Sequence, residues 1–185
     1  MGVGATNKRK GSTAERFYAK FFRDLGFEFC ETSRFVSKKH DNAKIDLMYV
    51  PFNVQVKAGV QSNMNPGKEL FLMATCISTM FPIEDEVHKK PHLLFHYKQG
   101  VRGKKRASED EMVYMSLIQF DVFNSKPGTK LEYSYLKEYK FDLQSEFKCI
   151  VGMTLEVFTR EVILKQYVNV SNHSNTPADT GVSSV

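Results

Sequence analysis

The sequence has few cysteines and no long apolar run, and each shortage excludes a class of protein. Its three cysteines, Cys30, Cys76 and Cys149, are an odd number at wide spacings. That pattern favours neither a disulfide framework nor a zinc ribbon, and it suits a reducing compartment. No run of about eighteen apolar residues occurs, so no transmembrane helix is expected. Residues 1–10 are polar and basic without an apolar stretch behind them, which argues against a secretory signal. We therefore expect a cytoplasmic protein without a membrane partner.

The residues that are present fit one domain with an anionic partner. Hydrophobic residues make up 42% of the 185 positions and aromatic residues 12%, which is enough to build a core. The formal net charge of +5 mildly favours a polyanion such as DNA. Positive charge concentrates at 8–10, 34–44 and 102–106, although a solvated loop explains each of these segments equally well.

Apolar spacing and turn residues predict most of the elements. Apolar side chains from Ala14 to Leu25 recur at helical spacing, with Ser12 suited to the N-cap and Gly26 to the position after the helix. The predicted elements are a helix at 12–25, a strand at 27–35, a basic loop at 37–42, a hairpin with arms at 44–50 and 54–58, a helix at 65–81, and strands at 92–98 and 112–123. This order predicts an α/β fold with a mixed central sheet flanked by helices.

The remaining segments are less regular. Residues 130–141 suit helix or strand, and 154–167 favour a helix. We expect a flexible basic arm at 1–10, a single domain at 11–170 and a disordered tail at 171–185. Within that domain, we expect a core at about 11–123 and a C-terminal extension at about 124–170.

The stretch AKIDLMYVPFNVQVKAG, at 43–59, places several polar side chains on the predicted hairpin. Strand side chains alternate, so Gln55 and Lys57 share one face. If the turn centres near Pro51, Asp46 lies opposite Lys57 and projects to the same side. A register change of one residue would remove this arrangement. The pattern therefore predicts that Asp46, Gln55 and Lys57 converge.

Such a trio suits chemistry around a divalent cation. Mg²⁺ prefers oxygen ligands, which the Asp46 carboxylate, the Gln55 amide and the Val56 backbone carbonyl can supply. The Lys57 ammonium can orient or help to deprotonate a water molecule, or stabilise charge on a phosphate. These roles describe the hydrolysis of a phosphodiester.

A carboxylate, a turn and a (Glu/Asp/Gln)-x-Lys strand together resemble the PD-(D/E)xK nuclease superfamily. The segment KRKGSTAERFYAKFFRDLGF, at 8–27, is similar to the first helix of archaeal-type Holliday junction resolvases. The resemblance covers about residues 8–60, followed by a compatible helix and two strands to 123. It implies a restriction-endonuclease-like fold, Mg²⁺ (with Mn²⁺ substituting) and no small-molecule cofactor. It also implies that Glu15 completes the metal site and that Asp46, Gln55 and Lys57 are catalytic.

The implied activity is metal-dependent cleavage of branched DNA in recombination or repair. Symmetric cutting of a four-way junction needs two sites, so a homodimer is expected. The sequence departs from the resolvases because Ile45 precedes Asp46 and because Gln55 stands where an acidic residue is usual. A glutamine keeps an oxygen ligand and loses a negative charge, which weakens metal affinity. The serine or threonine that resolvases carry after the second strand would be Thr32 or Ser33.

Several alternatives remain open. Glu15 also completes an S-x-x-E capping box with Ser12, and Asp46 and Lys57 could be a cross-strand ion pair. The enzyme could instead be a restriction or repair nuclease on duplex, flap or single-stranded DNA. The chain could also be a non-catalytic nucleic-acid-binding module or a plain α/β interaction protein. The candidate DNA contacts are Lys10, Arg16, Arg34, Lys38, Lys39 and Lys44.

Overall fold

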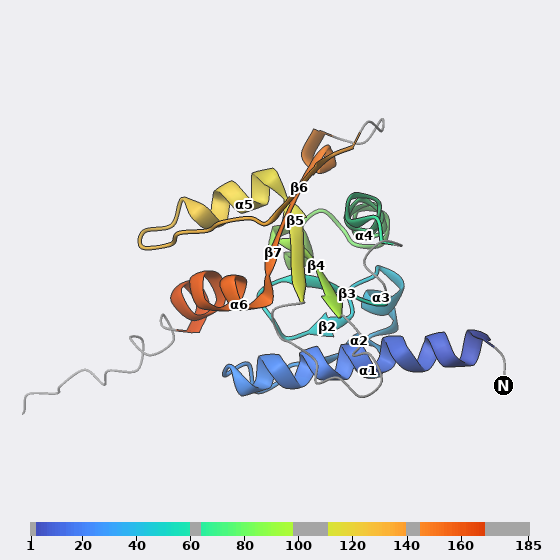
Figure 1. Cartoon of the computed structure of the whole chain (residues 1–185). Coiled ribbons are helices and arrows are strands. Elements are labelled where there is room, and N and C mark those ends of the chain that lie inside the picture. The colour runs from blue at the N-terminus through green and yellow to red at the C-terminus, as the bar shows by residue number, and fades with distance from the viewer. Residues whose placement is uncertain (1–2, 60–63, 98–110, 140–144, 169–185) are drawn as a thin grey trace, which may run out of the picture.

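The computed structural model describes residues 3–59, 64–97, 111–139 and 145–168, with side chains from Gly11 onward. It is a mixed α/β fold in which helices flank a five-stranded sheet of order β3-β4-β5-β7-β6 (Figure 1). Strands β3 and β4 are parallel, and the other neighbours are antiparallel. A separate ribbon pairs β1 with β2. The predicted fold class is therefore confirmed at the level of a mixed sheet flanked by helices.

The strands are β1 (Glu31–Thr32), β2 (Leu47–Met48), β3 (Asn53–Ala58), β4 (His92–Tyr97), β5 (Met112–Ser116), β6 (Tyr135–Glu138) and β7 (Cys149–Thr154). The helices are α1 (Val3–Asp24), α2 (Ser33–Val36), α3 (Lys38–Asn42), α4 (Pro66–Met80), α5 (Leu117–Asn124) and α6 (Leu155–Phe158). Helix α6 continues as the π-helix η5 (Thr159–Val168), and two 3₁₀ turns are η2 (Glu86–Lys89) and η4 (Ser145–Phe147). Among the described residues, no helix is long and apolar enough to span a membrane.

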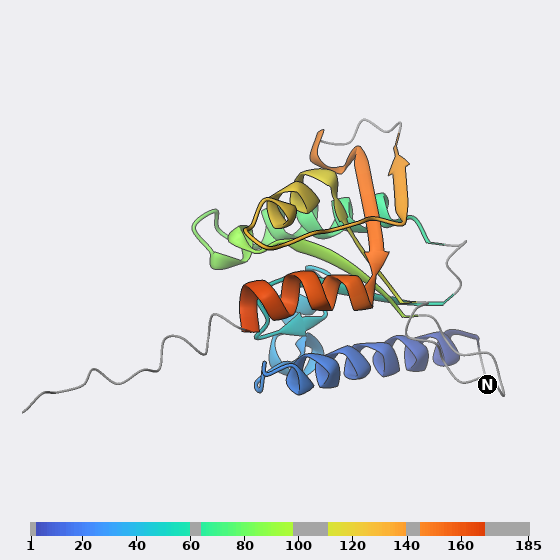
Figure 2. The same ribbon diagram turned by 60° about the vertical axis from the view of Figure 1, so that its left-hand side comes forward.

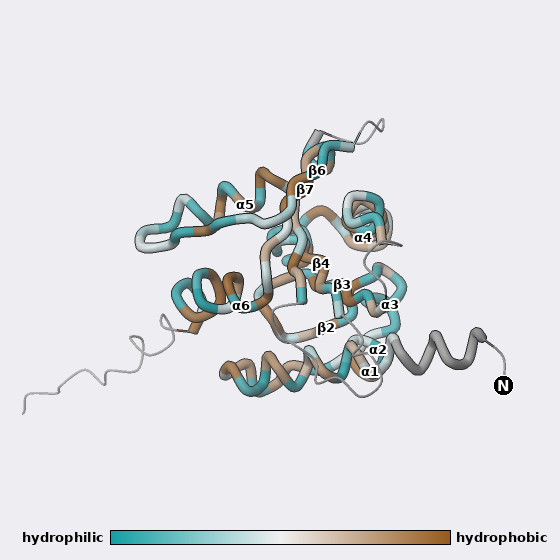
Figure 3. The backbone as a smooth tube through the Cα atoms, in the orientation of Figure 1, coloured by the Kyte–Doolittle hydropathy of each residue, from teal (hydrophilic) through white to brown (hydrophobic). Residues whose placement is uncertain are grey.

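Both faces of the inner strands of the sheet are buried, and alternation along these strands divides the core into two clusters. In β4, Phe95 belongs to the cluster that contains α1, α5 and α6, whereas Leu94 belongs to the cluster that contains α4. Figures 1 and 2 show α1 and the C-terminal helical segment side by side, away from α4. Figure 3 shows mostly hydrophobic colour along β4 and alternating colour along the coloured part of α1. Burial on both faces accounts for the nearly continuous apolar sequences of the inner strands.

Helix α1 is longer than the sequence predicts. It begins at Val3, so residues 3–10 are helical rather than a flexible arm, and Ser12 lies inside the helix rather than at its N-cap. The other end is confirmed, because Gly26 follows the helix with φ +102°, a conformation that favours glycine. The buried stripe contains Tyr18 and Phe22, while Phe17, between Ala14 and Leu25 in the predicted apolar stripe, keeps 38% of its surface exposed.

The segment from Phe27 to Ala58 differs most from its prediction. The expected strand at 27–35 is only the two-residue β1, and the basic loop at 37–42 is mainly α3, capped by the Ser37 side chain. The expected hairpin is absent as a ladder, because β2 pairs with β1 while β3 pairs in parallel with β4. Strand β3 uses one edge for the parallel pairing with β4 and presents the other edge to Asp46.

The C-terminal third is an integral part of the sheet rather than an extension. Strand β7 lies between β5 and β6, and the predicted helix at 154–167 is confirmed by α6 and η5. The expected strand at 112–123 is half right, because a helix begins at Leu117 after the Ser116 cap. Helix α4 and strand β4 match their predictions. The predicted hairpin loop at 99–111, apart from Glu111, and the tail at 171–185 lie outside the described residues.

Candidate active site

One cavity of about 620 Å³ brings together the four side chains that the sequence singles out. It lies where α1 and α3 approach the open edge of β3, the first strand of the sheet. The lining residues are Gly11, Glu15, Arg34, Asp41, Asn42, Lys44, Asp46, Gln55, Val56, Lys57 and Ala58. The predicted convergence is therefore present, although a parallel edge strand produces it rather than a hairpin.

Asp46 is anchored to the edge of β3 at two points. Its backbone N–H donates to the Val54 carbonyl, and its carboxylate Oδ2 accepts from the Val56 N–H, each at 2.7 Å. The carboxylate thus accepts the hydrogen bond that a backbone carbonyl would accept in a regular β-ladder. The backbone pairing between this segment and β3 therefore ends after the one bond to Val54. The N–H and C=O of one strand residue lie on the same side. The Val56 carbonyl, predicted as a ligand, therefore faces the same edge as the Asp46 carboxylate.

The Asp46 carboxyl is electrostatically unusual. Burial raises the pKa of Asp46 to about 7, and the negative charge of Glu15 adds to that rise. The Val56 N–H and the cations Lys57 and Arg34 oppose it without cancelling it. Strongly perturbed carboxyl groups in a cleft are typical of functional sites. Near neutral pH this group can exchange a proton for another cation.

Gln55 supplies an amide oxygen that has no hydrogen-bond partner among the described residues. The residue is only 3% exposed, and its Oε1 atom is fully buried. A buried carbonyl without a partner costs free energy, so such a group usually has a reason to be there. Because Gln55 lines the cavity beside Asp46, a cation in the cavity would satisfy this oxygen.

Glu15 projects from α1 into the same cavity, where Arg34 of α2 binds it. Glu15 is 4% exposed, and its Oε1 lies 2.7 Å from Arg34 Nη2. Burial raises the pKa of the Glu15 carboxyl, and the Arg34 charge partly offsets that rise. The capping-box alternative is wrong, because Ser12 is inside the helix and its hydroxyl accepts a bond from Arg16 instead.

Lys57 reaches the cavity from β3 and pairs with a residue that sequence analysis missed. Its Nζ lies 2.9 Å from Oε2 of Glu69, in the first turn of α4. The ion pair considered from the sequence was with Asp46, whereas the observed partner comes from the next helix. The sequence offered one signal for Glu69, because an acidic residue in the first turn of the predicted helix at 65–81 suits the helix N-terminus.

The predicted basic residues divide into those bound at the site and those on its rim. Arg34 also lies 3.6 Å from Asp41, so its charge is used inside the cavity rather than displayed to solvent alone. Lys44 lines the cavity with φ +66°. On α3, Lys38 is exposed, and Lys39 places its Nζ 4.1 Å from the Phe81 ring centre. The remaining two are Arg16, which is exposed, and Lys10, whose side chain lies outside the described part.

Two hydroxyl residues lie next to the site. The Ser33 N–H donates to the Asp46 carbonyl at 2.9 Å, which places the start of α2 against the Asp46 backbone. The hydroxyls of Thr32 and Ser33 are buried and have no hydrogen-bond partner within the described ranges. These are the two positions at which the resemblance placed a serine or threonine.

The donor set suits a hard divalent cation better than a soft one. Two carboxylates, an amide oxygen and a backbone carbonyl are the ligands that Mg²⁺ accepts. Among the residues that the structure describes, no three His, Cys, Asp or Glu side chains gather into a metal-binding group. A cation here would therefore depend on the unpartnered Gln55 oxygen to supplement Glu15 and Asp46.

Comparisons with known proteins add no relative. No family model, curated protein or solved structure matches this chain.

Proposed function

We propose that this chain is a divalent-metal-dependent endonuclease that hydrolyses DNA phosphodiester bonds. One observation carries the proposal, namely the convergence of Glu15, Asp46, Gln55 and Lys57 on one cavity with the Gln55 amide oxygen left without a partner in the described structure. A five-stranded mixed sheet with the site at its edge supports a restriction-endonuclease-like fold. The similarity of α1 to junction resolvases favours branched DNA as the substrate.

Each site residue has a role that its surroundings support. Glu15, Asp46, Gln55 and the Val56 carbonyl would hold Mg²⁺. Once bound, the cation would neutralise charge at the scissile phosphate and activate water. Lys57, held by Glu69, would donate from its ammonium to a phosphate oxygen or to the attacking water.

The charge distribution supports an anionic polymer as the partner. Lys38 and Lys39 are exposed on α3, whose last residues lead to the cavity. The chain carries a net charge of +5, and the duplex phosphate backbone attracts such clusters in a salt-dependent manner. The three cysteines form no disulfide, which fits the proposed reducing, cytoplasmic location. Symmetric cutting of a junction would require a homodimer.

The decisive experiment is a cleavage assay on labelled four-way junction, duplex, flap and single-stranded DNA. Each substrate would be incubated with Mg²⁺, with Mn²⁺ and with EDTA. We expect paired nicks on the junction with either metal and no nicks with EDTA. Lys57→Ala should lose at least a hundredfold in cleavage rate and keep DNA binding, whereas Lys130→Ala, a matched change at an exposed lysine that pairs with Glu132, should cut normally.

The outcomes separate the candidates. Cutting of duplex or flap DNA alone would support a nuclease and exclude the four-way junction as its substrate. Cutting by Lys57→Ala at the wild-type rate would make the site assignment wrong. A second candidate, a nucleic-acid-binding module on the same scaffold, draws support from the ion pair between Arg34 and Glu15, because it already neutralises one proposed ligand. That candidate predicts tight binding without cutting under any metal.

A further inference from the structure

The most exposed aromatic side chains of the described structure belong to one stretch of the chain. Phe29, Phe35 and Tyr49 are 79%, 76% and 56% exposed, whereas every other exposed aromatic residue in the described ranges stays below half. Each ring left exposed forgoes about 1.5–3 kcal/mol of stabilising free energy that its burial would contribute. Their position on and beside the β1–β2 ribbon therefore calls for a partner.

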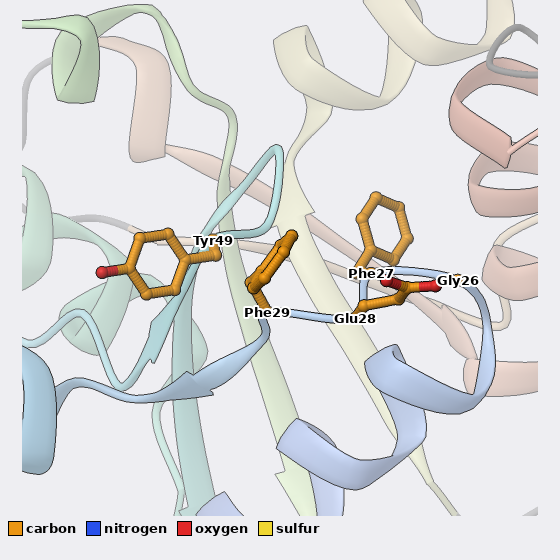
Figure 4. Close-up of a pocket in the computed structure, with 5 residues that line it drawn as sticks. All are labelled: Gly26, Phe27, Glu28, Phe29 and Tyr49. Carbon is orange, nitrogen blue, oxygen red and sulfur yellow. The ribbon is translucent and has the colours of Figure 1, made fainter.

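Phe29 and Tyr49 share a second cavity, of about 660 Å³. Figure 4 shows the two rings projecting from neighbouring segments, with Phe27 and Glu28 beside them. Phe29 precedes β1, and Tyr49 follows β2 with φ +61°, a conformation that non-glycine residues adopt rarely and at a cost. The cavity has the volume of a small-molecule site.

This aromatic cavity lies close to the candidate active site. Strand β2 connects them directly, because Asp46 precedes it and Tyr49 follows it. Three residues span at most about 11 Å between Cα atoms. Proteins that hold single strands typically cover about 4–16 nucleotides per binding module. A strand with a phosphate at the active site would therefore bring a base of the same strand within reach of Tyr49.

We propose that Phe29 and Tyr49 form a stacking platform for an unpaired base of the DNA strand. The inference rests on the proposed nuclease function and specifies its substrate class as DNA with unpaired bases beside the cleavage site. Aromatic side chains stack on bases of any sequence, and the Glu28 carboxylate can accept hydrogen bonds from a base amino group. The net charge of +5 is complementary to the phosphates of such a strand.

A second copy of the chain is a less suitable occupant. An apolar interface between copies would bury the Glu28 carboxylate, which carries a desolvation cost. A single strand avoids this cost, because its base edges donate hydrogen bonds to carboxylates.

The test measures binding in EDTA, where no metal-dependent cleavage occurs. The full chain would be titrated into an oligodeoxynucleotide containing 2-aminopurine, into the same strand with abasic sites, and into a duplex. The variants are Phe29→Ala and Tyr49→Asn, since asparagine tolerates the positive φ. The control is Leu136→Ala, which removes an exposed apolar side chain from β6 at the far edge of the sheet.

We expect each platform variant to weaken single-strand binding roughly tenfold or more and to reduce the change in 2-aminopurine fluorescence. Binding of the abasic strand and the duplex should change less than twofold, and Leu136→Ala should behave like the wild type. Wild-type binding and fluorescence in both folded variants would overturn the proposal. So would a variant that dissociates a wild-type dimer in sedimentation without altering the fluorescence, because the occupant would then be a second copy. Stacking of a base without cleavage in the metal assay would support the stacking platform and contradict the proposed nuclease activity.

Discussion

At the scale of single residues, Asp46 combines a structural bond with a destabilising charge. Its Oδ2 accepts from the Val56 N–H, yet burial raises the pKa of its carboxyl to about 7 from an ordinary value of 3.8. Between about pH 4 and pH 7, the folded chain keeps a proton that the unfolded chain has released. Stability from this group therefore falls as pH rises through that window, by at most about 4 kcal/mol.

Asp46→Asn should remove this pH dependence. The asparagine carbonyl can still accept from Val56, and it carries no charge at any pH. We expect the variant to match the wild type near pH 4 and to unfold at higher denaturant concentration near pH 8, while losing cleavage. Urea unfolding at both pH values checks this. Asp24→Asn, at an exposed ion pair with Lys20, is the control, and equal denaturation curves of Asp46→Asn and wild type at pH 8 would contradict the argument.

Gln55 provides a test of the cation site that does not depend on cleavage. Gln55→Glu would add a third carboxylate beside Glu15 and Asp46, so the metal-free protein should be less stable near pH 8. A divalent cation should reverse that loss, and the melting temperature should rise more with Mg²⁺ in the variant than in the wild type. Calorimetry with and without Mg²⁺ measures both effects. Gln119→Glu on α5 should show no added response, and an identical absence of response in Gln55→Glu would argue against a cation at this position.

At the scale of elements, the contact between β3 and α4 holds Lys57 in place. Glu69 lies 2.9 Å from its ammonium, and we expect it to position Lys57 rather than to touch the substrate. Glu69→Ala should therefore lower kcat about tenfold with little change in KM, and it should have no further effect in a Lys57→Ala background. A double-mutant cycle on kcat, with thermal melting in parallel, measures this coupling. Equal losses in both backgrounds would show that Glu69 acts independently of Lys57.

Elements with strong periodicity were predictable from the sequence, whereas short capped helices were not. Helix α4 and strand β4 follow their apolar patterns. The helix that begins at Leu117 was predicted as a strand because its residues have high β-propensity. However, SLIQ at 116–119 has the S-x-x-Q form of a capping box. The Ser116 hydroxyl accepts a hydrogen bond from the Gln119 N–H. Local capping overrode the propensity of the individual residues there.

The sequence predicted which residues line the site, but it did not predict how they are arranged. Spacing alone placed Gln55 and Lys57 on one face, because strand alternation is fixed by the backbone. The pairing of β3 with β4 depends on residues nearly forty positions apart, so no local pattern reveals it. Tertiary packing also creates the Arg34 to Glu15 and Lys57 to Glu69 ion pairs, so no local pattern reveals them either.

At the scale of the whole molecule, the sheet order makes the last third of the chain essential. Residues beyond 123 supply two of the five strands, namely β7, which lies inside the sheet between β5 and β6, and the edge strand β6. This segment also contributes fully buried side chains to the core, at Ile150, Val151, Met153, Phe158, Val162 and Ile163. Each such side chain contributes about 1.5–3 kcal/mol, so together they match the 5–15 kcal/mol by which domains are stable.

A chain ending at residue 125 should therefore fail to fold, even though it retains every proposed site residue. We expect no cooperative thermal transition and no cation response, because strand β5 loses its partner β7 and the core cluster shared by α1 and α6 loses the side chains of α6. A chain ending at residue 170 keeps all described residues and is the matched control, which should melt like the full chain. Circular dichroism and hydrogen exchange of β3 and β4 amides measure the outcome. Cooperative melting of the shorter chain would mean that the core expected at about 11–123 folds without the C-terminal extension.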